Sequence, residues 1–239
     1  MELTENMRVM ASGEQRLIEF DTWCLDLGNG DLQVDSGNDD IEIPEHMVFK
    51  LGTEAQEGND LDAFCKEIFP NISENYKIPG WFQQRAILAP TNRAVDWINE
   101  VILNAIPEEN VSLTSSDMVE NQDDMYRFNT EYLNTLTPTG LPKHRLVLKK
   151  GVIIMLLRNL DPRRGLCNGT RMTFVKTLNS KVLQCVVTTA TETRTVFIPR
   201  ITLRPRPNQY PFLWSRRQFP VRLAASFTIN KSQVRTIAN

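Results

Sequence analysis

The stretch RAILAPTNRAVDWINEVILNA, residues 85–105, decides the fold that we expect. Its first part, Arg85 to Pro90, is a short, continuous apolar run, as in buried strands of parallel sheets. Thr91 or Asn92 can cap the helix that follows. Apolar residues at helical spacing then predict a helix over 93–105, with one face formed by Val95, Ile98, Ile102 and Ala105. The turn therefore lies at the carboxyl end of a strand, where ligands of open parallel sheets collect.

Further elements flank this unit on its N-terminal side. Ser12 and Gln15 have the spacing of a capping box, and they predict a helix over 14–27 that Gly28-Asn29-Gly30 ends. A second, short helix is expected over 63–69. The polar stretches 30–45 and 108–130 are predicted to be mostly loop.

The C-terminal half is rich in short β-type pieces. They cover residues 146–148, 152–157, 171–177, 181–188 and 195–198, and turn residues separate them. This pattern predicts a small antiparallel barrel or sandwich. A Pro-rich linker over 204–208 follows, and then the run 221–229 returns to a buried apolar strand. The order indicates an α/β fold that is interrupted by an all-β insertion.

Composition excludes several classes of function. The 239 residues carry a net charge of −2, but basic residues dominate from Arg194 to Arg235, which indicates either a polyanion-binding face or a set of solvated charges. The four cysteines are far apart and the two histidines are isolated, so we expect no metal site. No signal peptide and no membrane-spanning run is visible, so we expect an intracellular chain. The patterns of a phosphate loop and of a serine hydrolase are also absent from the sequence.

Several stretches, taken in order, resemble one known family. They are Leu3-Thr-Glu-Asn-Met-Arg8, Arg85-Ala-Ile-Leu-Ala-Pro-Thr-Asn92, Gly140-Leu-Pro-Lys-His144, Met155-Leu-Leu-Arg-Asn-Leu160, Gly165-Leu-Cys-Asn-Gly-Thr-Arg171, Phe197-Ile-Pro-Arg-Ile201, Arg216-Arg-Gln-Phe-Pro-Val-Arg-Leu223 and Thr228-Ile-Asn-Lys-Ser-Gln233. The set resembles the C-terminal half of Pif-type DNA helicases, and the most similar members are those of the Helitron rolling-circle transposons of eukaryotes. The resemblance runs from about residue 2 to residue 233.

The resemblance implies a fold and a division into domains. Such helicases belong to superfamily one, in which ATP and Mg²⁺ lie between two RecA-like domains. Residues 1–124 would begin the second RecA-like domain, 125–205 would form an inserted, SH3-like β-barrel (the 2B-like domain), and 206–239 would return to the RecA-like domain. The chain would end just after the fifth helicase motif, and it has Val234 where the family has Gly.

The resemblance also implies functional residues. Arg8, in the fourth motif, would contact the phosphates of ATP and act in catalysis, and Gln233 would join it in nucleotide binding. The alternatives are a surface arginine for Arg8 and helix capping for the polar residues. Tyr126, Phe128 and Tyr132 could stack on bases or pack in the core. DNA contacts are expected from Pro90, Thr91, Asn92, Arg216, Arg217, Thr228, Asn230, Lys231 and Ser232.

The implied function is that of the C-terminal part of a nuclear, ATP-dependent 5′-to-3′ DNA helicase. It would act in DNA repair, recombination, telomere maintenance or Helitron transposition, with single-stranded DNA and an N-terminal RecA-like half as partners. Because the phosphate loop and the acidic magnesium motif are absent, we expect the chain alone to bind no ATP and to lack activity. The alternatives are a non-catalytic remnant that binds single-stranded DNA, and a relic that misfolds.

Overall fold

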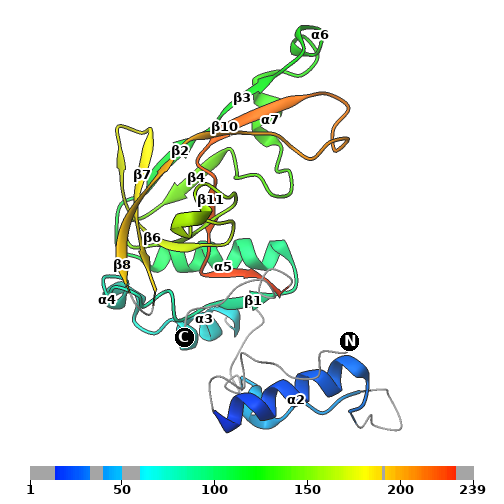
Figure 1. Ribbon diagram of the computed structural model, residues 1–239, viewed down its shortest axis with the longest axis vertical. Helices are drawn as coiled ribbons and strands as arrows, with labels where there is room; N and C mark the ends of the chain where they lie inside the picture. Colours follow the sequence, from blue (N-terminus) through cyan, green and yellow to red (C-terminus); the bar gives the residue numbers. More distant parts are fainter. Residues whose placement is uncertain (1–13, 33–39, 50–59, 190–191, 230–239) are drawn as a thin grey trace. The chain divides into compact units, whose positions relative to one another are not determined.

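The computed structural model describes residues 14–32, 40–49, 60–189 and 192–229 (Figure 1). Five of the predicted site residues, Arg8, Asn230, Lys231, Ser232 and Gln233, lie outside the described residues, as does Val234. The chain divides into two compact units, residues 1–52 and residues 53–239. Each unit is described by itself.

The first unit contains the predicted N-terminal helix. Helix α2 spans Gln15–Asn29, and it ends at Gly30, whose φ of 79° is the left-handed conformation that glycine adopts readily. The prediction of a helix over 14–27 is therefore confirmed, with an end two residues later. The N-cap residue Glu14 makes no side-chain capping bond, and Ser12, the predicted capping residue, lies outside the described residues. A single 3₁₀ turn, η1 (Glu45–Met47), follows.

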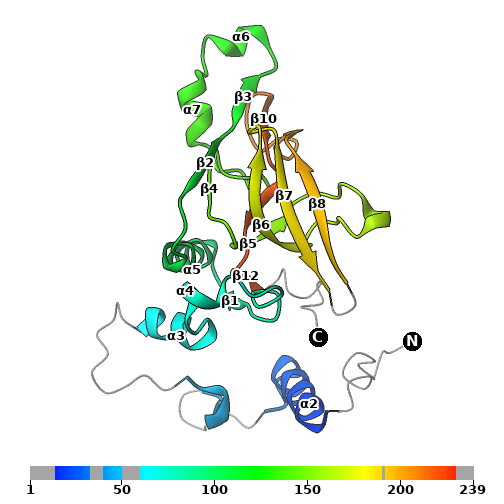
Figure 2. The same cartoon turned by 90° about the vertical axis from the view of Figure 1, so that its left-hand side faces the viewer.

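The α/β part of the second unit confirms the strand–turn–helix prediction. Strand β1 (Ile87–Ala89) leads into helix α5 (Asn92–Ala105), which buries Val95, Ile98 and Ile102. Strand β12 (Ser226–Thr228), from the end of the described chain, pairs with β1 in parallel. Helix α5 packs against both strands, as Figures 1 and 2 show. Helices α3 (Asp60–Ile68) and α4 (Ile72–Asn75) pack on α5, and α3 confirms the short helix predicted over 63–69.

Four of the five predicted β-type pieces join β11 in one antiparallel sheet in the order β11-β5-β6-β7-β8 (Figure 2). The fifth piece, 146–148, lies in a separate two-stranded sheet. The strands of the larger sheet are β11 (Val221–Leu223), β5 (Ile153–Leu156), β6 (Arg171–Leu178), β7 (Val182–Thr188) and β8 (Thr193–Pro199). Strands β11 and β8 form the two edges. The antiparallel arrangement is as predicted, whereas closure into an SH3-like barrel is not found among the described strands.

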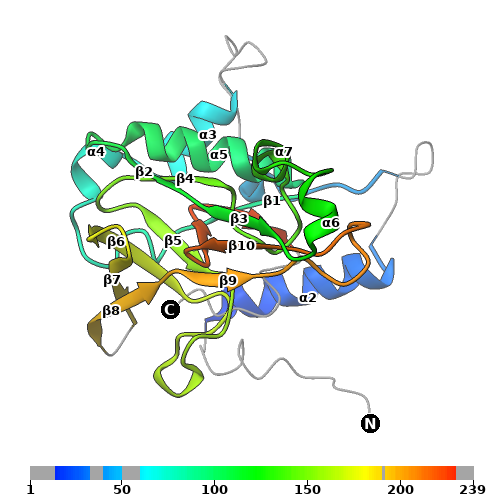
Figure 3. The same cartoon turned by 90° about the horizontal axis from the view of Figure 1, so that it is seen from above.

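Residues 108–130 differ from the loop that the sequence predicts. They contain β2 (Val111–Thr114), β3 (Ser116–Val119) and the short helix α6 (Gln122–Met125). Strand β2 pairs with β4 (Arg145–Leu148). Strand β3 pairs with β10 (Trp214–Gln218), which pairs on its other side with β9 (Ile201–Leu203; Figure 3). Helix α7 (Thr130–Thr135) packs on β3. Both missed strands have only four residues, two of them polar, so they lack the apolar run that marks a longer strand.

The apolar run over 221–229 is two strands rather than one. Strand β11 pairs antiparallel with β5, whereas β12 pairs parallel with β1, and the buried residues Ala224 and Ala225 join them. The chain therefore passes from the antiparallel sheet to the parallel pair within two residues. A continuous apolar run is compatible with both arrangements, so the pattern alone does not reveal the break.

Two of the four cysteines, Cys65 and Cys185, are buried, Cys167 is partly buried and Cys24 is exposed, which predicts a difference in reactivity. Burial raises the pKa of Cys65 to about 11, with Asp62 adding to the shift, and raises the pKa of Cys185 to about 12. Because thiolates are the reactive form, we expect a thiol reagent at pH 8 to modify Cys24 in the native chain and to reach Cys65 and Cys185 only after unfolding. Cys24→Ser should remove the fast phase of the reaction, and rapid native-state labelling of Cys185 would contradict the prediction.

Candidate nucleic-acid interface

The structure brings four of the predicted DNA-binding residues together at one end of the parallel pair. Pro90, Thr91 and Asn92 form the exposed turn between β1 and α5. Thr228, the last residue of β12, lies opposite Ala89 in the parallel register and is partly exposed. The carboxyl ends of both strands therefore meet the first turn of a helix, where unpaired backbone N–H groups favour anions.

Thr91 is the N-cap of α5, as the capping alternative predicted. Its Oγ1 accepts a hydrogen bond from the backbone N–H of Ala94 at 3.2 Å. One lone pair and the hydroxyl proton remain for a ligand at this exposed position. Capping and phosphate contact are therefore compatible roles for the same side chain.

The separation of these two roles is a testable prediction. Thr91→Ala should lower the free energy of unfolding by about 1 kcal/mol, because the cap is lost. Thr91→Asp should keep the stability, since aspartate is a good N-cap, but it should weaken binding of single-stranded DNA because a carboxylate repels phosphate. Urea unfolding and fluorescence anisotropy measure the two effects. If wild type and Thr91→Asp bind DNA equally well, Thr91 caps the helix and does not contact the phosphates.

Asn99 fixes the parallel pair to the helix, and sequence reasoning did not single it out. Its side-chain amide donates to the carbonyl of Ser226 at 2.9 Å and accepts from the N–H of Ser226 at 3.0 Å. The side chain thus pairs with the backbone of β12 as a neighbouring strand does. An asparagine on the apolar face of a predicted helix was the available signal.

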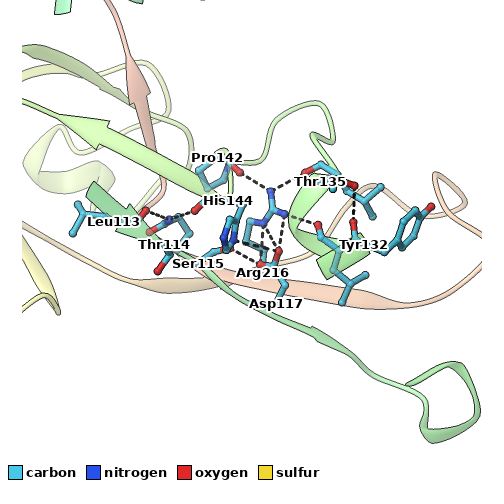
Figure 4. A network of polar contacts seen from close by, with 12 residues as sticks. Leu113, Thr114, Ser115, Asp117, Tyr132, Thr135, Pro142, His144 and Arg216 are labelled. Carbon is cyan, nitrogen blue, oxygen red and sulfur yellow. Dashed lines mark hydrogen bonds and ion pairs between the residues drawn. The ribbon is translucent and has the colours of Figure 1, made fainter. Parts of the chain in front are cut away.

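Arg216 is buried within the protein and is not available to contact DNA, which corrects one sequence prediction (Figure 4). Its side chain is completely buried, and it forms a bidentate ion pair with Asp117 at distances of 2.9 Å for Nε–Oδ1 and 2.7 Å for Nη2–Oδ2. Its remaining N–H groups donate to the carbonyls of Leu133, Leu136 and Pro142. All five donors of the guanidinium are therefore used within the protein. Arg217, the next residue on β10, is exposed and stays available for the predicted phosphate contact.

The same network brings a serine, a histidine and an aspartate together, but not as a catalytic triad. Ser115 Oγ donates to Asp117 Oδ1 at 2.6 Å and lies 2.8 Å from His144 Nδ1 (Figure 4). In a triad the histidine lies between the other two residues and accepts the serine proton. Here the serine lies in the middle and its proton points to a carboxylate that Arg216 already neutralises. The arrangement positions the loop that carries His144 and does not activate a nucleophile.

The aromatic residues of the 126–132 segment divide between the two predicted roles. Phe128 stacks on Phe212 with ring centroids 3.8 Å apart, and Tyr132 packs on Phe128 at 5.8 Å. Phe128 packs against a small core that contains Phe212 and Trp214, whereas Tyr132 is exposed. Tyr126, with 95% of its surface exposed, packs on none of them. Core packing therefore accounts for Phe128, whereas the exposed rings of Tyr126 and Tyr132 are accessible for stacking on a base.

Metal sites and membrane-spanning helices are both absent from the described residues. Within residues 14–32, 40–49, 60–189 and 192–229, no group of three or more His, Cys, Asp or Glu side chains could hold a metal ion. No helix in the same ranges is long and apolar enough to cross a membrane.

Comparison with known proteins agrees with the sequence resemblance. Residues 131–177 match the family described as the 2B domain of the DNA helicase Pif1. The chain is also 31% identical over 145 residues to the ATP-dependent DNA helicase PIF1 of Xenopus laevis. Part of this chain is therefore similar to the Pif1 DNA helicases. The match covers 58% of the chain but 20% of the Xenopus protein, so the chain spans about a fifth of that relative.

Solved structures of Pif1 helicases are among the matches. The Pif1 helicase from Candida albicans has 25% sequence identity and a TM-score of 0.47, and the match covers 73% of this chain and 42% of that one. Unliganded Pif1 from a Bacteroides species has 22% identity and a TM-score of 0.44, covering 64% of this chain and 44% of that one. The matched 2B family segment contains β4 and β5 and all but one residue of each of α7 and β6.

Proposed function

We propose that this chain is the part of an ATP-dependent 5′-to-3′ DNA helicase that binds the single strand. The observation that carries the proposal is the edge where Pro90, Thr91, Asn92 and Thr228 meet at the carboxyl ends of two parallel strands. Backbone N–H groups, hydroxyls and an amide at such an edge suit phosphate oxygens rather than base edges. Binding by these groups would be tolerant of sequence, as a translocating helicase requires.

Hydrolysis of ATP would also need the other, N-terminal RecA-like domain. The phosphate loop and the acidic magnesium motif are absent from this sequence, so ATP and Mg²⁺ would be held chiefly by residues of that other domain. Arg8 and Gln233 would complete the nucleotide site from this side. We therefore expect the chain alone to bind single-stranded DNA without hydrolysing ATP.

The test is a titration of a fluorescent oligo(dT) across a salt series, with circular dichroism on the same sample. Binding that weakens with salt, at equal strength for oligo(dT) and a mixed sequence, supports the proposal, because phosphate contacts release counterions. A folded chain that binds neither oligonucleotide would contradict it. A DNA-stimulated ATPase rate that Arg8→Ala abolishes would contradict the expected lack of hydrolysis.

A non-catalytic remnant that binds single-stranded DNA is the second candidate. The relation to Pif1 helicases and the missing ATP-binding motifs are compatible with both candidates. Addition of a separately expressed RecA-like domain from a Pif1 relative separates them. Restored ATPase activity favours the helicase part, and unchanged DNA binding with no ATPase favours the remnant.

A further inference from the structure

A cavity of about 420 Å³ lies next to the candidate interface. Helix α5 forms one wall, the loop 137–143 a second, and strands β4 and β11 the rest. Asn92, at the β1–α5 turn, lines this cavity as well, so the cavity and the candidate interface share a residue. A strand that crosses the turn therefore passes the cavity.

Arg222 is the unusual group of this cavity. It lies on β11 opposite Met155, and it is partly buried. Within the part of the chain that the structure describes, its guanidinium makes no hydrogen bond and no close ion pair. Burial lowers its pKa, an effect that the neighbouring Asp96 opposes. A part-buried arginine whose donors are not used within the protein can donate to water or to a ligand in the cavity.

The other charges around the cavity leave Arg222 available. Asp96, the carboxylate that acts on Arg222, is already paired with Lys143 at 3.0 Å. Arg145 donates from Nε to Ser112. Glu100 is the second carboxylate of the lining. Three cations thus face two carboxylates, and among the described residues of this lining the cation without a partner is Arg222.

The remaining wall of the cavity is apolar. Leu103, Leu141 and Leu223 line it, together with two prolines of the 137–143 loop. A cavity of several hundred Å³ with an apolar wall and few polar groups has the character of a small-ligand site. Its ligand would combine an anionic group with a flat, weakly polar body.

We propose that this cavity takes one nucleotide unit of a single-stranded nucleic acid, with its phosphate on Arg222 and its base against the apolar wall. This inference rests on the proposed function and extends it. A guanidinium holds phosphate oxygens through two parallel hydrogen bonds, and bases pack on apolar surfaces without regard to sequence. The cavity would hold the strand in position beside the β1–α5 turn.

The first test compares Arg222→Met with Arg163→Met. Both changes remove one positive charge, but Arg163 is exposed and lies on the 3₁₀ turn η2 (Pro162–Arg164), outside the lining of the cavity. The logarithm of the association constant for oligo(dT) falls linearly with the logarithm of the salt concentration. For Arg222→Met the magnitude of this slope should decrease by about 0.7, the change expected for one lost phosphate contact on a single strand. Arg163→Met should keep the wild-type slope. Arg222→Lys, which keeps the charge, should recover most of the slope.

Different outcomes identify different failures. If wild type does not bind oligo(dT), the proposed function fails. If wild type binds and the two methionine variants have the same slope, only the cavity inference fails. Thermal unfolding of each variant checks that it is folded at the temperature of the binding measurement.

A second variant tests the cavity without changing a charge. Thr139 is exposed and lines the cavity, so Thr139→Trp should fill it and weaken oligo(dT) binding at least several-fold while the chain stays folded. Undiminished binding by Thr139→Trp would overturn the inference. Competition with thymidine monophosphate tells a site for the strand from a site for a free nucleotide. If thymidine monophosphate displaces oligo(dT) only at millimolar concentration, the cavity is a site for the strand. Displacement at micromolar concentration would mean a free-nucleotide site instead.

Discussion

Arg216→Met is expected to lower the free energy of unfolding by about 3–5 kcal/mol. The change leaves the buried carboxylate of Asp117 without its cation, and it leaves three backbone carbonyls, of Leu133, Leu136 and Pro142, without a donor. An unpaired charge buried away from water destabilises the folded state by more free energy than the intact ion pair contributes to stability. Urea unfolding followed by tryptophan fluorescence measures the loss as a shift of the midpoint.

Arg217→Met is the matched control for this prediction. It lies next to Arg216 on β10 and removes the same charge, but its side chain is exposed, so its effect should stay within about 0.5 kcal/mol. The double variant Arg216→Met with Asp117→Leu should recover part of the loss, because neither charge then remains buried. An equal loss for Arg216→Met and Arg217→Met would show that the network contributes nothing to stability.

The strand–turn–helix unit could be predicted because each of its signals is local. An apolar run, a capping threonine and a helical repeat of apolar residues follow one another within 85–105, and the structure has β1, the Thr91 cap and α5 in these places. The pairing of β1 with β12 connects residues about 140 positions apart in the sequence. The motif resemblance, rather than any local pattern, assigned Thr228 to DNA contact along with Pro90, Thr91 and Asn92.

The opposite roles of Arg216 and Arg217 could not be predicted in the same way. Adjacent residues of a strand point to opposite faces, so the register of β10 decides which arginine is buried. That register depends on β3, where Arg216 lies opposite Asp117. Because residues 108–130 were predicted to be loop, no partner strand was available to bury an arginine, and both arginines were assigned to DNA.

Arg171 connects the antiparallel sheet to the candidate interface. From β6 its Nη1 donates to the carbonyl of Gln83, and its Nη2 donates to those of Phe82, Arg85 and Ala224, at 2.7–3.1 Å. Residues 82–85 lead into β1, and Ala224 precedes β12. One side chain thus holds the segments that lead into the two strands of the parallel pair. Burial lowers the pKa of Arg171 to about 10, so the guanidinium is still charged at neutral pH.

Arg171→Met should therefore lower the free energy of unfolding by about 3 kcal/mol, because four carbonyls lose a charged donor. Lys176→Met is the control, since Lys176 is an exposed cation on the same strand. DNA binding at a temperature where the variant is folded separates two roles of Arg171. Weakened oligo(dT) binding by folded Arg171→Met, with wild-type binding by Lys176→Met, means that Arg171 positions the ends of β1 and β12. Unchanged binding with lowered stability means that the pairing of β1 with β12 and the Asn99 contact hold the edge without it.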